Sequence, residues 1–463
     1  MTSNVAAHQC RADNLWQADG WCPDVALAVD ANGRWMASAR LAEESVGRGG
    51  ESIGQWVLPG MPNLHSHAFQ RAMAGLAERK GRADDSFWSW REAMYAFAST
   101  IGPDQLQAIA AQLYVEMLKA GYTQVCEFHY LHHQPDGTPC EQPAAMSLAL
   151  IEAAREAGIG LTLLPVLYMS GGFDGRDLTT RQRRFGQTVE SYLRLLEGLR
   201  QRESDSIRVG AALHSLRAVP AEAMTQVLAD PLLADCPIHI HVAEQIGEVQ
   251  DCLAIRGARP VEWLFEHAQV DARWCLIHAT HLTEDEILQL ARSGAVAGLC
   301  PTTEANLGDG LFPLASYQDA GGTLGIGSDS HISVSPVEEL RWLEYGQRLS
   351  TRHRNIAARK QGDSVGETLW RAALLGGRQA AGFSTDALQE GSRADLIVLD
   401  DNAPLLAARD VTSVMDTLLF AGNTPLVRDV MVGGQWQVRD FRHRDEERIA
   451  RRYRATVTGL LAG

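Results

Sequence analysis

The sequence lacks the features of secreted and membrane-spanning chains. No segment approaches the roughly 18 uninterrupted apolar residues that a membrane helix needs. The first residues, MTSNVAAHQCRADNLW, contain neither the charged n-region nor the apolar h-region of a signal peptide. The eight cysteines include no CxxC pair, so we expect reduced core residues rather than disulfides or a cysteine zinc site. These absences predict a cytoplasmic protein with no membrane partner.

Positive charge is scarce as well. Lys and Arg total 42 against 57 Asp and Glu, which gives a formal net charge of −15 at pH 7. This balance argues against nucleic acid or an anionic membrane as a partner. The only lysines are Lys80, Lys119 and Lys360. An anionic ligand would therefore have to be bound by local arginines, whose planar guanidinium groups pair with carboxylates through two hydrogen bonds.

What the sequence does contain is an alternation of apolar strand-like segments and amphipathic helix-like segments. In 463 residues, 45% of them hydrophobic, helical periodicity marks QLQAIAAQLYVEMLKAGY, MSLALIEAAREAG and EDEILQLARSG, each ending at or just before a glycine. Eight strand-like segments separate such stretches: WVLPGMPNLHSH, TQVCEFHY, GLTLLPVLY, IRVGAALHSL, PIHIHVAE, WCLIHATHL, AVAGLCPTT and TLGIGSDSH. This alternation predicts an α/β protein with a (β/α)8 TIM-like barrel over residues 60–384.

The barrel region is longer than the usual ~250 residues, so we expect insertions. The candidates are AFQRAMAGLAERKGRADDSFWSWREAMYAF after the first strand and DGRDLTTRQRRFGQT after the third. The two ends of the chain have a different pattern. They contain strand-like segments interrupted by NG and GG turns, namely DVALAVDANGRWMASAR, ADLIVLDD and DVMVGGQWQVRD. We expect residues 1–59 and 385–463 to form together a small β-sandwich domain.

The first predicted barrel strand carries the motif HSH. Alternate side chains of a strand share a face, so His65 and His67 would point to one spot and supply half a metal site. Taken alone, the motif is equally compatible with a polar strand end whose histidines only form local hydrogen bonds. The other strand ends decide between these interpretations.

Polar residues fall at the ends of three more predicted strands. His241 ends the fifth strand with Glu244 three residues later, His278 ends the sixth, and Asp329 the eighth. Because carboxyl ends of barrel strands meet on one face, these residues and the HSH pair would converge. Three histidines and an aspartate are the ligand types of a catalytic zinc that keeps one position open for water.

Other histidines are compatible with the same spacing. His239 shares a strand face with His241, and we favour His241 because it lies nearer the strand end. His278 and His281 can also be loop histidines with local hydrogen bonds. Spacing alone leaves further candidates open, namely His129, His132, His133 and His331.

Five motifs resemble those of the amidohydrolase superfamily and its aminohydrolase branch. In chain order they are PGMPNLHSH, HVAE, IHATH, CPTTEANLGDG and GIGSDSH. GSRADLIVLD resembles the small β domain of that superfamily. Within the branch, NLHSHAFQRAMAG, FWSWREAMY, CEFHYLHH and LHSLRAV resemble the formimidoylglutamate deiminase family. The resemblance implies one zinc per chain and a homodimer. It implies as metal ligands His65, His67, His241 and Asp329.

A two-metal site in this superfamily usually involves a carboxylated lysine at the end of the fourth strand. This chain has no lysine between Lys119 and Lys360. One metal per chain is therefore the better prediction.

The resemblance also implies the reaction, hydrolysis of N-formimidoyl-L-glutamate to N-formyl-L-glutamate and ammonia in histidine degradation. Zinc lowers the pKa of a bound water to about 7. We expect Asp329 to accept the proton of that water, His278 to orient the attacking oxygen, and Glu244 to protonate the leaving nitrogen.

The substrate would carry two carboxylates. The resemblance implies that the residues in contact with it are Gln70, Arg91, Tyr130, His214 and Arg217. Two alternatives remain: another aminohydrolase acting on a purine, pyrimidine or triazine ring, and a catalytically inactive barrel that serves as a scaffold. A flat ring would favour stacking contacts over paired arginines, and an inactive barrel would be expected to have lost metal ligands.

Overall fold

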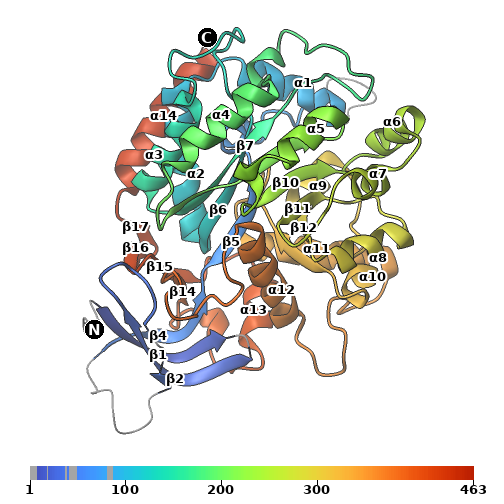
Figure 1. Cartoon of the computed structure of the whole chain (residues 1–463). Helices are drawn as coiled ribbons and strands as arrows, with labels where there is room; N and C mark the ends of the chain where they lie inside the picture. Colours follow the sequence, from blue (N-terminus) through green and yellow to red (C-terminus); the bar gives the residue numbers. More distant parts are fainter. Residues whose placement is uncertain (1–7, 18, 37–38, 41–49, 81–86, 463) are drawn as a thin grey trace.

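The fold is described from a computed structural model, which covers residues 8–17, 19–36, 39–40, 50–80 and 87–462. A barrel surrounded by helices forms the larger part, and a sheet built from both ends of the chain lies beside it (Figure 1). Part of the insertion predicted after the first strand, residues 81–86, lies outside the described residues.

Parallel strands form the wall of the barrel. Each of the eight apolar segments contributes one, and the extra strand β8 (Ile207–Val209) pairs with β7. In spatial order the wall consists of β13 (Thr323–Ile326), β12 (Val296–Leu299), β11 (Trp274–His278), β10 (Ile238–Val242), β9 (Ala211–Ser215), β7 (Gly160–Leu167), β6 (Tyr122–His129) and β5 (Met61–Ser66). The segment after β13 closes the ring, because the backbone N–H of Asp329 donates to His65 O at 3.0 Å and that of His67 to Asp329 O at 3.1 Å. The predicted (β/α)8 barrel is confirmed.

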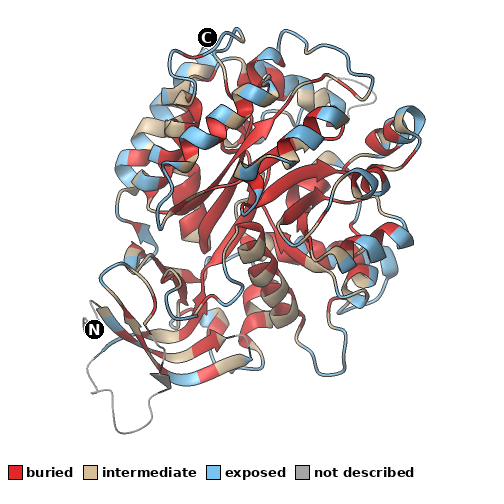
Figure 2. Cartoon of the chain, in the orientation of Figure 1, coloured by how far each residue is buried: buried red, intermediate tan, exposed pale blue. Residues whose placement is uncertain are grey.

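Helices cover the outside of the barrel. The barrel strands are buried, and the exposed faces of the helices point outward (Figure 2). The three helices read from the sequence are α2 (Pro103–Ala120), α3 (Ala145–Ala157) and α8 (Glu284–Ser293). The remaining barrel helices are α4 (Val189–Arg200), α5 (Ala221–Leu228), α6 (Ile246–Arg256), α7 (Pro260–His267), α9 (Pro301–Leu307), α10 (Leu314–Asp319), α11 (Pro336–Thr351) and α12 (Val365–Ala380). Short 3-10 helices occur as η2 (Arg183–Phe185), η3 (Pro231–Leu233) and η4 (Pro404–Leu406).

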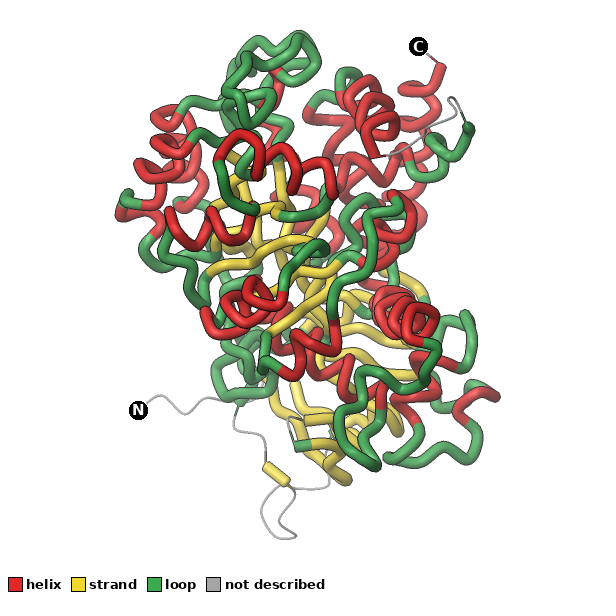
Figure 3. The backbone as a smooth tube through the Cα atoms, turned by 90° about the vertical axis from the view of Figure 1, so that its right-hand side faces the viewer, coloured by secondary structure: helices red, strands yellow, loops and turns green. Residues whose placement is uncertain are grey.

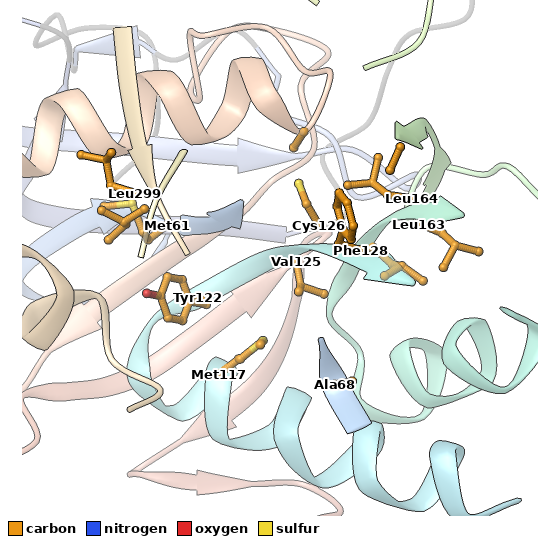
Figure 4. Packing of buried hydrophobic residues seen from close by; sticks show 14 of the residues in the cluster. Met61, Ala68, Met117, Tyr122, Val125, Cys126, Phe128, Leu163, Leu164 and Leu299 are labelled. Carbon is orange, nitrogen blue, oxygen red and sulfur yellow. The ribbon is translucent and has the colours of Figure 1, made fainter. Parts of the chain in front are cut away.

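Local sequence signals explain where these helices begin and end. Thr283 and Glu286 cap the start of α8 reciprocally, because each side chain accepts a hydrogen bond from the backbone N–H of the other. Gly121 ends α2 in the left-handed conformation at φ 104°, which costs glycine little. In the core, Val125 of β6 points toward α2 and Cys126 points to the other side of the strand (Figure 4).

The insertion after β5 adds η1 (Ala68–Met73) and α1 (Phe87–Ala98) on the carboxyl-end side of the barrel. The side view shows the barrel strands enclosed by helices, with a second group of strands below them (Figure 3). The inserted elements reach the rim where the predicted site residues lie.

The second group of strands is one eight-stranded sheet formed by both ends of the chain. Its centre is the antiparallel pair of β4 and β14, in which Leu58 lies opposite Ile397. The strands, in spatial order, are β17 (Arg442–His443), β16 (Gln435–Arg439), β15 (Val427–Val432), β14 (Leu396–Leu399), β4 (Glu51–Pro59), β1 (His8–Gln17), β2 (Gly20–Val29) and β3 (Ala39–Arg40). The small β domain assembled from both termini is confirmed, and its boundaries at residues 59 and 384 stay predictions.

Two helices of the C-terminal region accompany this sheet. They are α13 (Val414–Phe420) and α14 (Glu446–Ala462). The last helix, α14, packs against the barrel helix α2, and Lys119 Nζ lies 2.8 Å from Glu446 Oε2 between them. The end of the chain thus fastens the small domain to the barrel.

All eight cysteines are buried free thiols, as expected from their positions. None of the described helices has both the length and the apolar character required to cross a membrane.

Candidate active site

The HSH pair meets a third histidine at the carboxyl end of the barrel. His65 lies in β5, His67 directly follows that strand and His241 lies in β10, and one ring nitrogen of each falls within 4.8 Å of the others. The two Nε2 atoms of His241 and His65 are 3.0 Å apart. Asp329 Oδ1 lies 3.2 Å from His67 Nε2 and 3.4 Å from His65 Nε2. We call these four residues the ligand cluster.

Hydrogen bonds to the backbone set the orientation of two of these rings. His67 Nδ1 donates to Phe128 O and His241 Nδ1 donates to His214 O, each at 2.9 Å. A ring whose Nδ1 carries the proton presents Nε2 as a lone pair. Burial also lowers the pKa values of His67 and His241, which favours neutral imidazoles. Lone pairs converging beside a carboxylate suit a divalent cation, so the donor set fits zinc.

The alternative histidines have other partners. Although His239 lies two residues before His241, its Nε2 donates to Ala380 O at 2.8 Å. His132 and His133 bond to Val166 O and Gly186 O. Neither group of potential metal ligands found among the described residues includes His129, His132, His133, His239, His281 or His331.

Carboxylates surround His278 at the end of β11. Its Nε2 lies 3.8 Å from Glu244 Oε1 and 3.9 Å from Asp329 Oδ2, and its Nδ1 lies 3.2 Å from Glu304 Oε1. Burial opposes a charge on the ring, but these three carboxylates outweigh it and raise the pKa of His278 to about 10. Burial raises the pKa of Glu244 to about 7, the range in which a carboxyl group can exchange a proton near neutral pH.

Cys300 also lies near this group, since its Sγ falls within 4.8 Å of ligand atoms of His278 and Asp329. Burial raises the pKa of the Cys300 thiol well above its usual range. A protonated thiol is a poor metal ligand. The structure therefore agrees with the expectation that this cysteine belongs to the core.

The turns after the strands carry unusual backbone angles. Ala243, which precedes Glu244, has φ 52°, His278 has φ 69° and Asp329 has φ 46°. Residues other than glycine rarely adopt positive φ, and such positions concentrate at functional sites where the surrounding fold holds them. These angles direct the three functional side chains toward one another.

One pocket joins these groups to the predicted substrate contacts. His67, His241, Glu244, His278 and Asp329 line it. All five predicted substrate residues line it as well: Gln70, Arg91, Tyr130, His214 and Arg217. His65 does not line the pocket, and its side chain is fully buried.

Arg91 and Arg217 form the other end of the pocket, and we call them the arginine pair. Arg91 Nη1 and Arg217 Nε are buried and have no hydrogen-bond partner in the part of the chain that the structure describes. Gln70 Nε2 donates to Tyr130 OH at 2.9 Å, and Gln70 Oε1 is likewise buried without a partner. Buried polar groups are normally satisfied, so these atoms are suited to a polar ligand.

The sequence did not single out Glu304, which follows β12 in α9. Its carboxylate contacts His278 Nδ1 and accepts a hydrogen bond from the backbone N–H of Cys300 at 2.8 Å. The motif CPTTEANLGDG follows the seventh predicted strand, and its position at the rim was the signal that could have identified this residue. The aromatic pocket residues Trp90, Tyr95 and Tyr168 were missed too, since aromatic side chains are more often part of the core.

Known proteins resemble this chain in sequence and in fold. The Amidohydrolase family matches residues 56–437. A formimidoylglutamate deiminase from Pseudomonas aeruginosa is 53% identical over 451 residues, which cover 97% of this chain and 99% of that protein. The crystal structure of an amidohydrolase from Brucella melitensis superposes with a TM-score of 0.92 at 46% identity and covers 98% of this chain and 100% of that one.

A more distant structure shares the fold. An atrazine chlorohydrolase from Arthrobacter aurescens, crystallised with zinc, has a TM-score of 0.81 at 22% identity and covers 97% of this chain and 99% of its own. The resemblance read from the motifs is confirmed by the match along most of the chain. The chain belongs to the amidohydrolase family.

Proposed function

We propose that this protein is a zinc-dependent hydrolase that converts N-formimidoyl-L-glutamate and water to N-formyl-L-glutamate and ammonia, a reaction of histidine degradation. The observation that carries the proposal is the pocket that joins the ligand cluster to the arginine pair. A sequence identity of 53% to a formimidoylglutamate deiminase, over 97% of this chain, supports the same substrate.

One zinc per chain would be held by His65, His67, His241 and Asp329. When bound there, zinc lowers the pKa of a water to about 7 and so supplies a nucleophile at neutral pH. Because lysine is absent between Lys119 and Lys360, the chain offers no carboxylated lysine for a second metal in that part of the barrel.

Side chains of the protein transfer the protons of the reaction and stabilise its charges. Asp329 accepts a proton from the attacking water, and its Oδ2 lies 3.9 Å from His278 Nε2. The cationic ring of His278 orients the attacking oxygen and stabilises its negative charge until the new carbon–oxygen bond forms. Glu244 donates a proton to the imino nitrogen. Asp329 then gives the proton that it accepted to the same nitrogen, and the hydroxyl group on the carbon returns a proton to Glu244. The carbon–nitrogen bond breaks, ammonia leaves, and the formyl group remains on the glutamate nitrogen.

The arginine pair binds the two carboxylates of the substrate. Charge-assisted pairs between arginine and carboxylate are among the strong hydrogen bonds in proteins, and burial strengthens them. Gln70, Tyr130 and His214 lie between the two ends of the pocket, where they orient the substrate. Two cations suit a dicarboxylate better than a flat uncharged ring.

We further propose that the protein works as a homodimer in the cytoplasm, acting on a small molecule without a nucleic-acid or membrane partner. The net charge of −15 supports the absence of polyanionic partners.

The test is an ammonia-release assay on zinc-loaded protein. Formimidoylglutamate is compared with guanine, cytosine and adenosine at equal concentrations, and metal content is measured on the same samples. We expect rapid release from formimidoylglutamate alone and one zinc per chain. Release from a ring substrate instead would replace the proposed function with that of another aminohydrolase. Absence of stoichiometric zinc and of all activity would indicate an inactive scaffold.

A further inference from the structure

A partly exposed tryptophan of the inserted helix α1 lies beside both members of the arginine pair. The centroid of the Trp88 ring is 5.0 Å from Arg91 Cζ and 5.7 Å from Arg217 Cζ. Trp88 keeps 41% of its surface exposed although α1 offers buried positions on its other face. One indole therefore contacts both guanidinium groups that the proposed function assigns to substrate carboxylates.

This contact has an electrostatic consequence. Both guanidinium groups lie beside the same indole, and the carboxylates of Glu248 and Glu244 also attract the guanidinium of Arg217. The face of an indole carries partial negative charge and attracts guanidinium groups. Arg91 has a second ring, Tyr95, at 5.2 Å, whereas the described contact of Arg217 with a ring is to Trp88. Trp88 thus attracts both guanidinium groups to one place while no ligand is bound.

Two neighbours lie beside the indole, Phe87 of the same helix and Gly247 of another. The rings of Phe87 and Trp88 meet edge to face at 5.1 Å between centroids, and Phe87 is buried. On the other side, a side-chain carbon added at Gly247 would lie 3.6 Å from Trp88 Cζ2. Gly247 belongs to α6, which begins two residues after Glu244. Trp88 therefore connects the inserted helix α1 to the segment that carries the proposed proton donor.

We propose that Trp88 is a specificity-determining residue, which holds Arg91 and Arg217 at the spacing that binds both carboxylates of one short dicarboxylate. This inference rests on the proposed function for the identity of the substrate. Each arginine keeps a buried N–H without a partner, on Nη1 of Arg91 and Nε of Arg217. A ligand with two carboxylates satisfies both, whereas a ligand with one carboxylate leaves one of these N–H groups without a partner.

The experiment compares two acids of equal carbon number, glutarate and pentanoate, which differ by one carboxylate. Binding to the zinc-loaded protein is measured by calorimetry for the wild type, Trp88→Leu and Trp88→Phe. Steady-state kinetics with formimidoylglutamate, zinc content and the thermal midpoint are recorded for each variant. The matched control is Trp342→Leu in α11, because Trp342 is similarly exposed at 44% but is not among the rings that contact Arg91 or Arg217 in the described part of the chain.

For Trp88→Leu we expect the affinity for glutarate to fall about ten-fold, with a matching rise in KM and little change in kcat or zinc content. Pentanoate binding should change much less. Trp88→Phe keeps an aromatic face and should restore most of the loss, which a purely structural role of tryptophan bulk would not predict. The control variant should behave as the wild type.

The inference is overturned if the wild type binds glutarate and pentanoate equally. It is also overturned if Trp88→Leu leaves the preference for glutarate intact, or if leucine and phenylalanine act alike. Failure of the proposed function has a different signature, because wild-type protein would then release no ammonia from formimidoylglutamate while the comparison of the two acids still reports on Trp88.

Discussion

The two ends of the pocket are built from different parts of the fold. Each residue of the ligand cluster lies in a barrel strand or directly after one. In the arginine pair, Arg91 comes from an inserted helix and Arg217 from the loop after β9. The ligand cluster is held by the backbone ladder of the barrel, where hydrogen bonds join the segments of His65 and Asp329. The arginine pair depends on side-chain packing between elements, so a change in this pair need not disturb the metal ligands.

The largest effect should come from breaking the ligand cluster while sparing its neighbour on the same strand. We expect His241→Ala to lose zinc and to lower kcat/KM by about a thousand-fold or more. His239→Ala should retain zinc, because His239 bonds to Ala380 O away from the cluster. Its cost should appear in stability, about 1–3 kcal/mol for the carbonyl left unpaired. Metal analysis measures the zinc content of both variants, and thermal unfolding measures their stability. Zinc loss confined to His239→Ala would make His239 rather than His241 the metal ligand.

The next effect concerns proton transfer at the metal end. Glu244→Gln keeps the size of the side chain but cannot donate a carboxyl proton, so kcat should fall by about 10²–10⁴ while zinc stays bound. Burial raises the pKa of Glu244 to about 7. Since donation requires the protonated form, wild-type kcat/KM should decrease as pH rises through about 7.

The pH-rate profile and zinc content of both proteins check this prediction. The decrease near pH 7 should be missing from the residual activity of Glu244→Gln. A variant that retains most of its activity would remove Glu244 from the reaction.

A smaller effect on kcat/KM should follow from removing one cation of the arginine pair. Arg91→Met leaves a substrate carboxylate without its cation, which costs about 2 kcal/mol or more, or about thirty-fold in kcat/KM. Zinc content should not change, which separates this end from the ligand cluster. Arg194→Met is the control, because Arg194 is an exposed arginine of α4. Steady-state kinetics that match the wild type would exclude Arg91 from the site.

The smallest effect should come from Glu304, which acts on the reaction only through His278. Glu304→Gln keeps an acceptor for His278 Nδ1 but removes a negative charge that helps to raise the pKa of the ring. We expect kcat to fall about ten-fold with zinc retained, and Glu304→Ala to fall further because the ring also loses its orientation. Equal rates for the glutamine and alanine variants would show that charge alone matters.

Much of the metal end could be predicted from the sequence. The period of the strands placed His65 and His67 on one face, and the position of each strand end selected Glu244, His278 and Asp329. Glu304 was not identified because, in sequence, a helical glutamate of the site cannot be distinguished from a glutamate on a solvated helix face until its neighbours in space are known. The arginine pair came from resemblance, since an arginine in a loop gives no local signal that separates a pocket residue from a surface one.

By itself the sequence determined the alternation of strands and helices, the small domain at the two ends, and the residue types at the strand ends. These features follow from local periodicity and from the rule that parallel strands in a barrel share one carboxyl face. Only the tertiary structure decided that His241 rather than His239 faces His65 and His67, and that Trp88 contacts both Arg91 and Arg217. Such choices depend on side chains far apart in the sequence, which the closing of the barrel and the packing of the insertion bring together.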